Sequence, residues 1–325
     1  MGKDSRLAAA VALAPVLFAP ASFADERVLL FSAYPTEQAV LLAKAAPVTE
    51  IGVFNHRRFF AGTIEGKNVI MGLTGIGMVN SERTATAALK YAADNDITVK
   101  GIIYSGVAGG PNIGDVVVPD RWTDGLPNQY PVDAGMFAVA SGLDVTLNPY
   151  LPIEDAACLG LRPGLTPIRV EIDPVLRIGG LGASGDPYGE RAVPCLSYAG
   201  DLIGCEACGS PLNTSPDIVG FLEDAVPFFD PQFFLDLFES FAPGGGGGGG
   251  SETPVVGDME TAAVARLAVA RGIPFLAFRA VSDGGGDPII VSRTLGFPFQ
   301  FFIYEQLAAD NAAAVVIEFL KSWNP

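Results

Sequence analysis

Apolar runs of strand length alternate with segments of helical composition along most of the chain. The run from Arg27 to Ser32 is followed by a turn at Ala33-Tyr34-Pro35-Thr36 and then by a helix-like segment from Glu37 to Ala46. Asn80 or Ser81 is placed to cap a helix that begins at Glu82. The same periodicity predicts further strands at 62–73 (two strands joined at 65–66), 101–104, 115–119, 175–181 and 274–281, and helices at 82–95, 259–271 and 304–322. Strands that alternate with helices predict an α/β fold.

Glycine-rich turns follow several of these strands, and two acidic residues stand beside such turns. Glu260 opens a helix directly after a strand, and Asp283 follows the end of another strand. Ligands of open α/β sheets bind at the carboxyl ends of strands, so both acids are candidates for chemistry. Taken alone, each is better explained as a helix N-terminal charge or as a turn cap.

The middle of the chain departs from this alternation. The stretch from about Asp124 to Pro174 is rich in proline and glycine and predicts few regular elements. Residues 190–253 are interpreted as an insertion with an aromatic run, Phe228 to Phe241, and a heptaglycine, Gly244 to Gly250. The glycines predict a flexible loop, and the aromatic run fits a packed helix, an interface or a lid.

The N-terminal segment has the composition of a secretory signal peptide. A basic start precedes the apolar stretch from Leu7 to Phe18, which is too short to span a bilayer. Ser22-Phe23-Ala24 places small residues at the −3 and −1 positions of a cleavage site. We therefore expect a signal peptide at 1–24, an exported protein (periplasmic or extracellular), and a single domain at 25–325. An uncleaved amphipathic helix or membrane anchor is the alternative.

Charge limits the classes of partner. The 325 residues include 36 acidic and 20 basic side chains, which gives a formal net charge of −16. Such a surface repels phosphate backbones and anionic lipid, so we expect no nucleic-acid partner and no membrane partner after signal cleavage. A small, neutral substrate is compatible with it. The acidity is also explained by solubility alone.

Four cysteines are present: Cys158, Cys195, Cys205 and Cys208. In an exported chain an even number favours disulfides, with three possible pairings. Cys205 and Cys208 form a CxxC, which a metal half-site or a redox pair would also use. The chain has no second CxxC, and its one histidine, His56, is distant in sequence, so structural disulfides are favoured over zinc.

Four motifs occur in a fixed order, and together they are specific. They are Gly75-Ile76-Gly77, Ser105-Gly106-Val107-Ala108-Gly109-Gly110 with Gly114-Asp115-Val116, Asp258-Met259-Glu260-Thr261-Ala262-Ala263, and Phe278-Arg279-Ala280-Val281-Ser282-Asp283. This set resembles the nucleoside phosphorylase/nucleosidase superfamily, most closely the methylthioadenosine/S-adenosylhomocysteine nucleosidases and their exported relatives. The resemblance covers roughly Val28 to Pro119 and Pro254 to Trp323. It implies a three-layer α/β/α sandwich with a mixed central sheet, and a homo-oligomer, a dimer or a trimer.

The resemblance also implies the catalytic residues. Asp283 matches the general acid that protonates N7 of a purine. Glu260 matches the acid that binds the ribose hydroxyls. Glu37, in the turn after the first strand, matches the carboxylate that activates the attacking water.

The substrate-binding residues are implied in the same way. Met259 would pack under the sugar, and Ser282 would orient Asp283. Tyr188 would stack on the purine. The loop formed by Ser105, Gly106 and Val107 would line the substrate site.

These residue types suit cleavage of an N-glycosidic bond. Positive charge develops on the sugar and negative charge on the departing base, and protonation of the base contributes about 10²–10⁴-fold. An acid in that role needs a raised pKa, which an apolar, enclosed setting provides. Three carboxyl groups perform this reaction without a metal ion or a cofactor, and none is expected.

Hydrolysis is favoured over phosphorolysis. Phosphorylases of this superfamily place arginines after the first strand and before the loop that here begins at Ser105. This chain has Glu37 and Tyr104 in those regions. Arg57, Arg58 or Arg83 could still reach the site, although His56-Arg57-Arg58 is better explained as a solvated loop.

The sequence therefore predicts a purine nucleosidase acting on adenosine-type nucleosides or their 5′-thioethers. A purine nucleoside phosphorylase is the first alternative. A non-catalytic nucleoside-binding or storage protein with the same fold is the second, since an exported location fits it.

Overall fold

The computed structural model describes most of the chain outside the N-terminus and the middle. The described residues are 25–125, 127–151, 168–171, 173–186, 188, 191–195, 204–208, 253–285 and 296–325. The expected signal peptide, the aromatic run, the heptaglycine and Cys158 lie outside them. Among the described helices, none is both long and apolar enough to cross a membrane.

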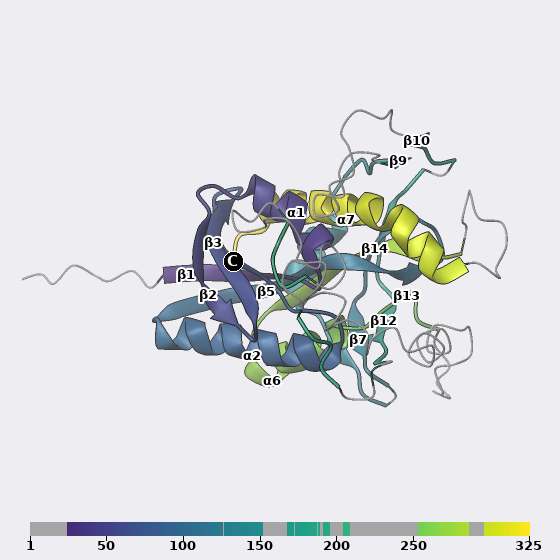
Figure 1. Cartoon of the computed structure of the whole chain (residues 1–325). Helices are drawn as coiled ribbons and strands as arrows, with labels where there is room; N and C mark the ends of the chain where they lie inside the picture. The colour runs from purple at the N-terminus through teal and green to yellow at the C-terminus, as the bar shows by residue number, and fades with distance from the viewer. Residues whose placement is uncertain are drawn as a thin grey trace, which may run out of the picture.

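A large mixed sheet forms the centre of the molecule (Figure 1). Its strands are β1 (Asp25–Ser32), β2 (Thr49–Phe54), β3 (Arg57–Ile64), β4 (Lys67–Leu73), β5 (Ile97–Gly110), β6 (Val116–Val118), β7 (Arg121–Thr123), β8 (Tyr130–Pro131), β11 (Leu176–Ile178), β12 (Leu181–Ser184), β13 (Val256–Asp258) and β14 (Phe275–Gly284). The main path runs β2-β3-β4-β1-β5-β13-β12-β7-β8, and β14 pairs with both β5 and β6. A separate pair is formed by β9 (Tyr150–Leu151) and β10 (Ile168–Arg169).

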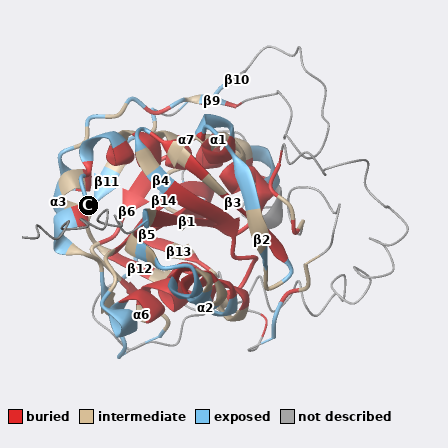
Figure 2. Ribbon diagram, turned by 90° about the vertical axis from the view of Figure 1, so that its left-hand side faces the viewer, coloured by how far each residue is buried: buried red, intermediate tan, exposed pale blue. Residues whose placement is uncertain are grey.

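Helices cover the sheet on both faces. The helix α1 (Pro35–Lys44) packs with α7 (Gly296–Ser322) on one face, where α3 (Ala134–Ser141) also lies. The opposite face is covered by α2 (Met78–Asp94) and α6 (Thr261–Arg271). Each face has its own apolar core, and the buried residues fill the layers on either side of the strands (Figure 2). The expected three-layer α/β/α sandwich with a mixed central sheet is confirmed.

The three central strands are buried and parallel. β5 pairs with β1 on one side and with β14 on the other. The Ser105–Gly110 motif, expected as a turn after a short strand, continues β5 instead, because the segment from Phe278 to Gly284 of β14 pairs with it along its whole length, with one register shift. The carboxyl ends of β1, β5 and β14 therefore lie together, which brings their motifs to one edge of the sheet.

Two local predictions differ from the structure. The His56-Arg57-Arg58 segment is not a solvated loop, because Arg57 and Arg58 are buried at the start of β3. Asn55 and His56 both have positive φ and form a tight turn between β2 and β3, as hairpins require. The helix α2 begins at Met78, and no side chain caps its N-terminus. The cap expected from Asn80 or Ser81 is therefore not formed.

Candidate active site

Arg279 joins three carboxylates that are far apart in the sequence. Its side chain, on β14, is 0% exposed, and its guanidinium lies over the ring of Tyr104, 4.5 Å from the centroid. Nε lies 2.6 Å from Oδ2 of Asp258, Nη2 lies 3.1 Å from Oε2 of Glu260, and Nη1 lies 3.4 Å from Oε1 of Glu37. One cation therefore contacts three acidic groups in a buried cluster.

Glu37 is held in place by backbone donors. It projects from the first turn of α1, where Oε2 accepts a hydrogen bond from Ala33 N–H (2.5 Å) and Oε1 accepts one from Val107 N–H (2.7 Å). A Cβ atom at Gly106 would lie 2.3 Å from Oε1, so only glycine allows this approach. Burial raises the pKa of Glu37 to about 7, against the opposing effect of Arg279 and of these donors.

Glu260 stands at the N-cap position of α6 but does not cap the helix. Asp258 does so, because its Oδ1 accepts the N–H groups of Glu260 and Thr261, both at 3.2 Å. Glu260 Oε1 instead accepts Gly77 N–H at 3.0 Å, which ties it to the glycine turn before α2. Burial raises the pKa of Glu260 to about 8, with smaller contributions from Asp258 and Glu37 and against the opposing effect of Arg279.

Asp283 lies farther along β14, outside the ion-pair cluster. The ladder to β5 shifts register between Val281 and Asp283, and Asp283 then pairs with Gly109. Ser282 Oγ donates to Asp283 Oδ1 at 2.8 Å, as the resemblance implied. Burial raises the pKa of Asp283 from 3.8 to about 6. Within the described residues no cation pairs with this carboxyl.

Tyr188 and Met259 lie against the same edge of the sheet. Tyr188 is buried in a small apolar cluster with Ile76 and Val193, and Met259 packs against that cluster. A Cβ at Gly77 would lie 3.1 Å from the Tyr188 ring, so the ring covers the turn that holds Glu260.

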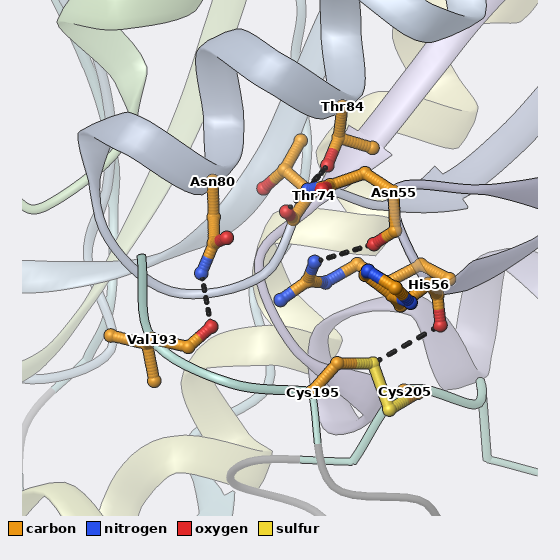
Figure 3. The surroundings of a disulfide bond; sticks show 9 residues. Asn55, His56, Thr74, Asn80, Thr84, Val193, Cys195 and Cys205 are labelled. Atoms are coloured by element: carbon orange, nitrogen blue, oxygen red, sulfur yellow. Dashed lines mark hydrogen bonds between the residues drawn. A yellow bond between two sulfur atoms is a disulfide. The ribbon is translucent and has the colours of Figure 1, made fainter. Parts of the chain in front are cut away.

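A disulfide holds the chain next to this cluster. Cys195 is bonded to Cys205, with Cα atoms 5.0 Å apart, and Cys208 is also disulfide-bonded. Figure 3 shows Asn80 Nδ2 donating to Val193 O, at 2.6 Å, on the other side of the same segment. The segment that follows Tyr188 is therefore tied at two points, and Cys205 is not one half of a Cys205–Cys208 redox pair.

The three loop residues expected to line the site, Ser105, Gly106 and Val107, differ in what they contribute to it. Val107 contributes its backbone N–H, and Gly106 contributes the absence of a side chain. The Ser105 hydroxyl is buried without a hydrogen-bond partner in the described part of the chain.

The sequence interpretation missed Arg279, Asp258 and Tyr104. Arg279 stood inside one of the quoted motifs, in the middle of an otherwise apolar strand. A charged residue in a buried strand requires a charged partner, and that signal could have revealed the cluster. The ring of Tyr104 packs against the guanidinium of Arg279, and the Tyr104 hydroxyl lies 2.6 Å from Thr74 Oγ1.

The three candidate arginines for phosphate are not equivalent. Arg58 pairs with Glu50, and Arg83 is exposed on α2. Arg57 is 3% exposed, donates to Asn55 O at 2.9 Å and lies against Gly75, where a Cβ would be 2.0 Å from Nη2.

Known proteins resemble this chain in sequence. An uncharacterized protein of Mycobacterium tuberculosis is 35% identical over 195 residues, which cover 58% of this chain and 79% of that protein. A 5′-methylthioadenosine/S-adenosylhomocysteine nucleosidase of Haemophilus influenzae is 26% identical over 261 residues, which cover 80% of this chain and 84% of that protein.

Solved structures share the fold. The crystal structure of the 5′-methylthioadenosine/S-adenosylhomocysteine nucleosidase from Neisseria meningitidis in complex with methylthio-immucillin-A aligns with a TM-score of 0.52 and 20% identity, over 91% of this chain and 99% of that chain. The family model of the phosphorylase superfamily matches residues 27–193 and 249–321, on both sides of the segment 194–248. This match extends over more than half of the sequence, and the chain therefore belongs to the phosphorylase superfamily.

Proposed function

We propose that this protein is a purine nucleosidase that hydrolyses the N-glycosidic bond of adenosine-type nucleosides. The observation that supports it most is the convergence of Glu37 and Glu260 on Arg279, with both carboxyls raised in pKa by burial. Perturbed carboxyl groups brought together from distant segments are typical of an active site. The relatives named above as nucleosidases support the same reaction class.

In the proposed reaction, Asp283 is the general acid. Its proton passes to N7 of the purine while the bond between C1′ and N9 breaks. With a pKa of about 6, a fraction of the protein carries the protonated carboxyl near neutral pH, and a bound base that excludes water would increase that fraction. Ser282 fixes the orientation of the carboxyl.

Glu37 and Glu260 act on the sugar. Glu37 accepts a proton from the water that attacks C1′, and Glu260 accepts hydrogen bonds from the ribose hydroxyls. Ionised Glu37 stabilises the positive charge that develops on the sugar. Met259 lies beneath the sugar, and Tyr188 covers the base.

A phosphorylase remains the second candidate because of Arg57. This buried guanidinium has no carboxylate within ion-pairing distance among the described residues, and burial lowers its pKa to about 10. An anion beside Gly75 would satisfy it. Glu37, which is ionised in the proposed reaction, would repel phosphate, and this favours water as the nucleophile.

Export is part of the proposal. Disulfides persist in oxidising compartments, and the bond between Cys195 and Cys205 is consistent with passage out of the cytoplasm. Cleavage after Ala24 stays a prediction.

The test is release of free base from adenosine, inosine and methylthioadenosine, with and without phosphate. Release of base and free sugar without phosphate supports the nucleosidase. Release that requires phosphate assigns the phosphorylase, and its loss in an Arg57→Met variant would identify the phosphate ligand. Tight binding without release would assign a non-catalytic binding protein.

A further inference from the structure

A buried tyrosine hydroxyl without a partner lies beside the catalytic carboxylates. Tyr34 precedes α1 and is 4% exposed, and its hydroxyl has no hydrogen-bond partner among the described residues. A buried hydroxyl that is left unsatisfied destabilises the folded protein, so native structures rarely retain one without a ligand or water. By contrast, the buried hydroxyl of Tyr104 lies 2.6 Å from Thr74 Oγ1.

The position of Tyr34 is fixed from two sides. Its backbone N–H, with that of Ala33, donates to the carboxylate of Glu37. Its ring packs against Phe301 of α7, with centroids 5.7 Å apart. The backbone of Tyr34 is therefore held at Glu37, and its ring is held at α7.

The charged groups of the site act on the hydroxyl. After burial itself, the groups that act on the phenol are Glu37, Glu305, Arg279 and Glu260, and together they place its pKa well above the ordinary range. Tyr34 is therefore a neutral hydroxyl at any physiological pH, able to donate one hydrogen bond and to accept others.

The ligand group follows from the roles proposed above, and this inference rests on that proposed function. In that proposal Asp283 binds the base, Glu260 binds the 2′ and 3′ hydroxyls, and Glu37 binds the attacking water. Of the three sugar hydroxyls, the one that remains without a partner is the 5′-hydroxyl. A thioether sulfur at that position is a weak acceptor and cannot donate.

We propose that the Tyr34 hydroxyl binds the 5′-oxygen of the substrate and selects nucleosides with a free 5′-hydroxyl over those with a 5′-thioether or 5′-deoxy group. A site built to bind a hydroxyl discriminates against the analogue that lacks it, because the buried protein group is then left unpaired. Tyr34 is thus a specificity-determining residue that touches the substrate remote from the bond that breaks.

The experiment compares kcat/KM for adenosine and 5′-deoxyadenosine in the wild type and in Tyr34→Phe, with inosine and 5′-deoxyinosine in parallel. The wild type is expected to prefer the 5′-hydroxy substrate by about tenfold or more. Tyr34→Phe, which keeps the ring against Phe301, should lose this preference. Its kcat/KM for the 5′-deoxy substrate should stay within about twofold of the wild-type value.

Tyr91→Phe is the matched control, since Tyr91 is a partly buried tyrosine of α2 that packs against Phe54 and should leave the ratio unchanged. Equal losses on both substrates in Tyr34→Phe would overturn the inference, because the hydroxyl would then act on the water or on Glu37. A wild type that cleaves 5′-deoxyadenosine as well as adenosine would overturn it without any variant. Failure of the wild type to release base from either substrate would instead overturn the proposed function, and this inference with it.

Discussion

Two buried carboxyl groups in the site differ in what surrounds them. Glu37 lies beside Arg279 and accepts backbone hydrogen bonds, and its pKa is nevertheless about 7. Asp283 has no cation nearby among the described residues, and its pKa is about 6. In the proposed reaction Glu37 must be ionised and Asp283 must be protonated. The reactive form is therefore most abundant between these two values.

The pH dependence of kcat/KM should identify each group. We expect a bell with its maximum near pH 6.5 in the wild type. Asp283→Asn should lower kcat by a factor of about 10² or more, and its residual activity should rise with pH and level off above about 7, where Glu37 is ionised. Glu37→Gln should show the opposite profile, with activity that falls above about pH 6. Steady-state kinetics from pH 4.5 to 9 measures both.

The two variants control for each other. If both kept the wild-type bell, the two limbs would belong to other groups. A kcat close to wild type in Asp283→Asn would exclude Asp283 as the acid.

Arg279 should matter to stability as well as to activity. Arg279→Met leaves Asp258, Glu260 and Glu37 buried together without a counter-ion, which should cost about 3–5 kcal/mol in the free energy of unfolding. Arg266→Met is the control, because Arg266 pairs with Asp124 and Glu82 at a more exposed position and should cost about 1 kcal/mol or less. Urea unfolding at pH 7 gives both values, and equal losses would contradict the central role of Arg279.

The sequence offered candidate acids for the site but not their cation. The resemblance implies roles for Glu37, Glu260 and Asp283, and these roles stay predictions. Arg279 is 242 positions from Glu37 along the chain, and their contact depends on the pairing of β14 with β5. The residue that caps α6 could not be predicted from the sequence for a related reason. Asp258 and Glu260 are both acids at the start of this helix, and only the fold shows which of them caps it.

At the scale of elements, strands and helices with regular patterns were predicted and short or irregular ones were not. β1, β4, β6 and α6 lie within a few residues of their expected bounds. β2 was missed because its burial does not alternate, and its hairpin turn uses Asn55 and His56 at positive φ rather than glycine. α7 begins eight residues before the expected Tyr304, in an aromatic stretch whose pattern favours no single element.

The disulfide should act on substrate binding through one such irregular element. Residues 191–195 carry Val193 beside Tyr188 and are tied by the bond from Cys195 to Cys205. Breaking that bond in a Cys195→Ser/Cys205→Ser variant should raise the KM for nucleoside by roughly three- to tenfold, because the base-covering segment must be ordered on binding. The kcat should change less, since Glu37 and Asp283 lie on other elements.

Reduction of the wild type provides the control. A reductant should raise the wild-type KM to the level of the double variant and should leave the KM of the double variant unchanged. An unchanged KM in both would show that the Asn80–Val193 hydrogen bond alone holds the segment.

At the scale of the whole molecule, the α/β class was predictable and the order of the strands was not. Alternation of strands and helices favours layers, but it does not show that β5 is the strand shared by β1, β13 and β14. The close packing around β5 depends on its glycines, which let side chains of other elements approach the strand. Gly106 lies beside Glu37, and Gly109 lies beside Asp283. Contacts of this kind join residues far apart in sequence and leave no local pattern.

The buried acids should also make the free energy of unfolding depend on pH. The pKa of Asp283 is raised in the folded protein from 3.8 to about 6. Below about pH 4 both the folded and the unfolded states hold the proton, and the carboxyl does not lower the free energy of unfolding. As the pH rises to about 6 the unfolded state releases its proton first, and the folded state loses stability. Above that value the loss is complete, on the order of 3 kcal/mol.

Asp283→Asn should therefore be more stable than the wild type at pH 8 and equally stable at pH 4, since an asparagine oxygen still accepts the hydrogen bond from Ser282.

Asp310→Asn is the matched control. Asp310 lies on α7, accepts a hydrogen bond from Gln306 and has a pKa that burial also raises to about 6. It should gain stability in the same direction and by a similar amount at pH 8, because its pKa is raised to the same value, and it should retain base release. Thermal unfolding at the two pH values measures both. If Asp283→Asn gained nothing at pH 8, Asp283 would ionise as freely in the folded protein as in the unfolded chain, and it could not supply the proton that the leaving base requires.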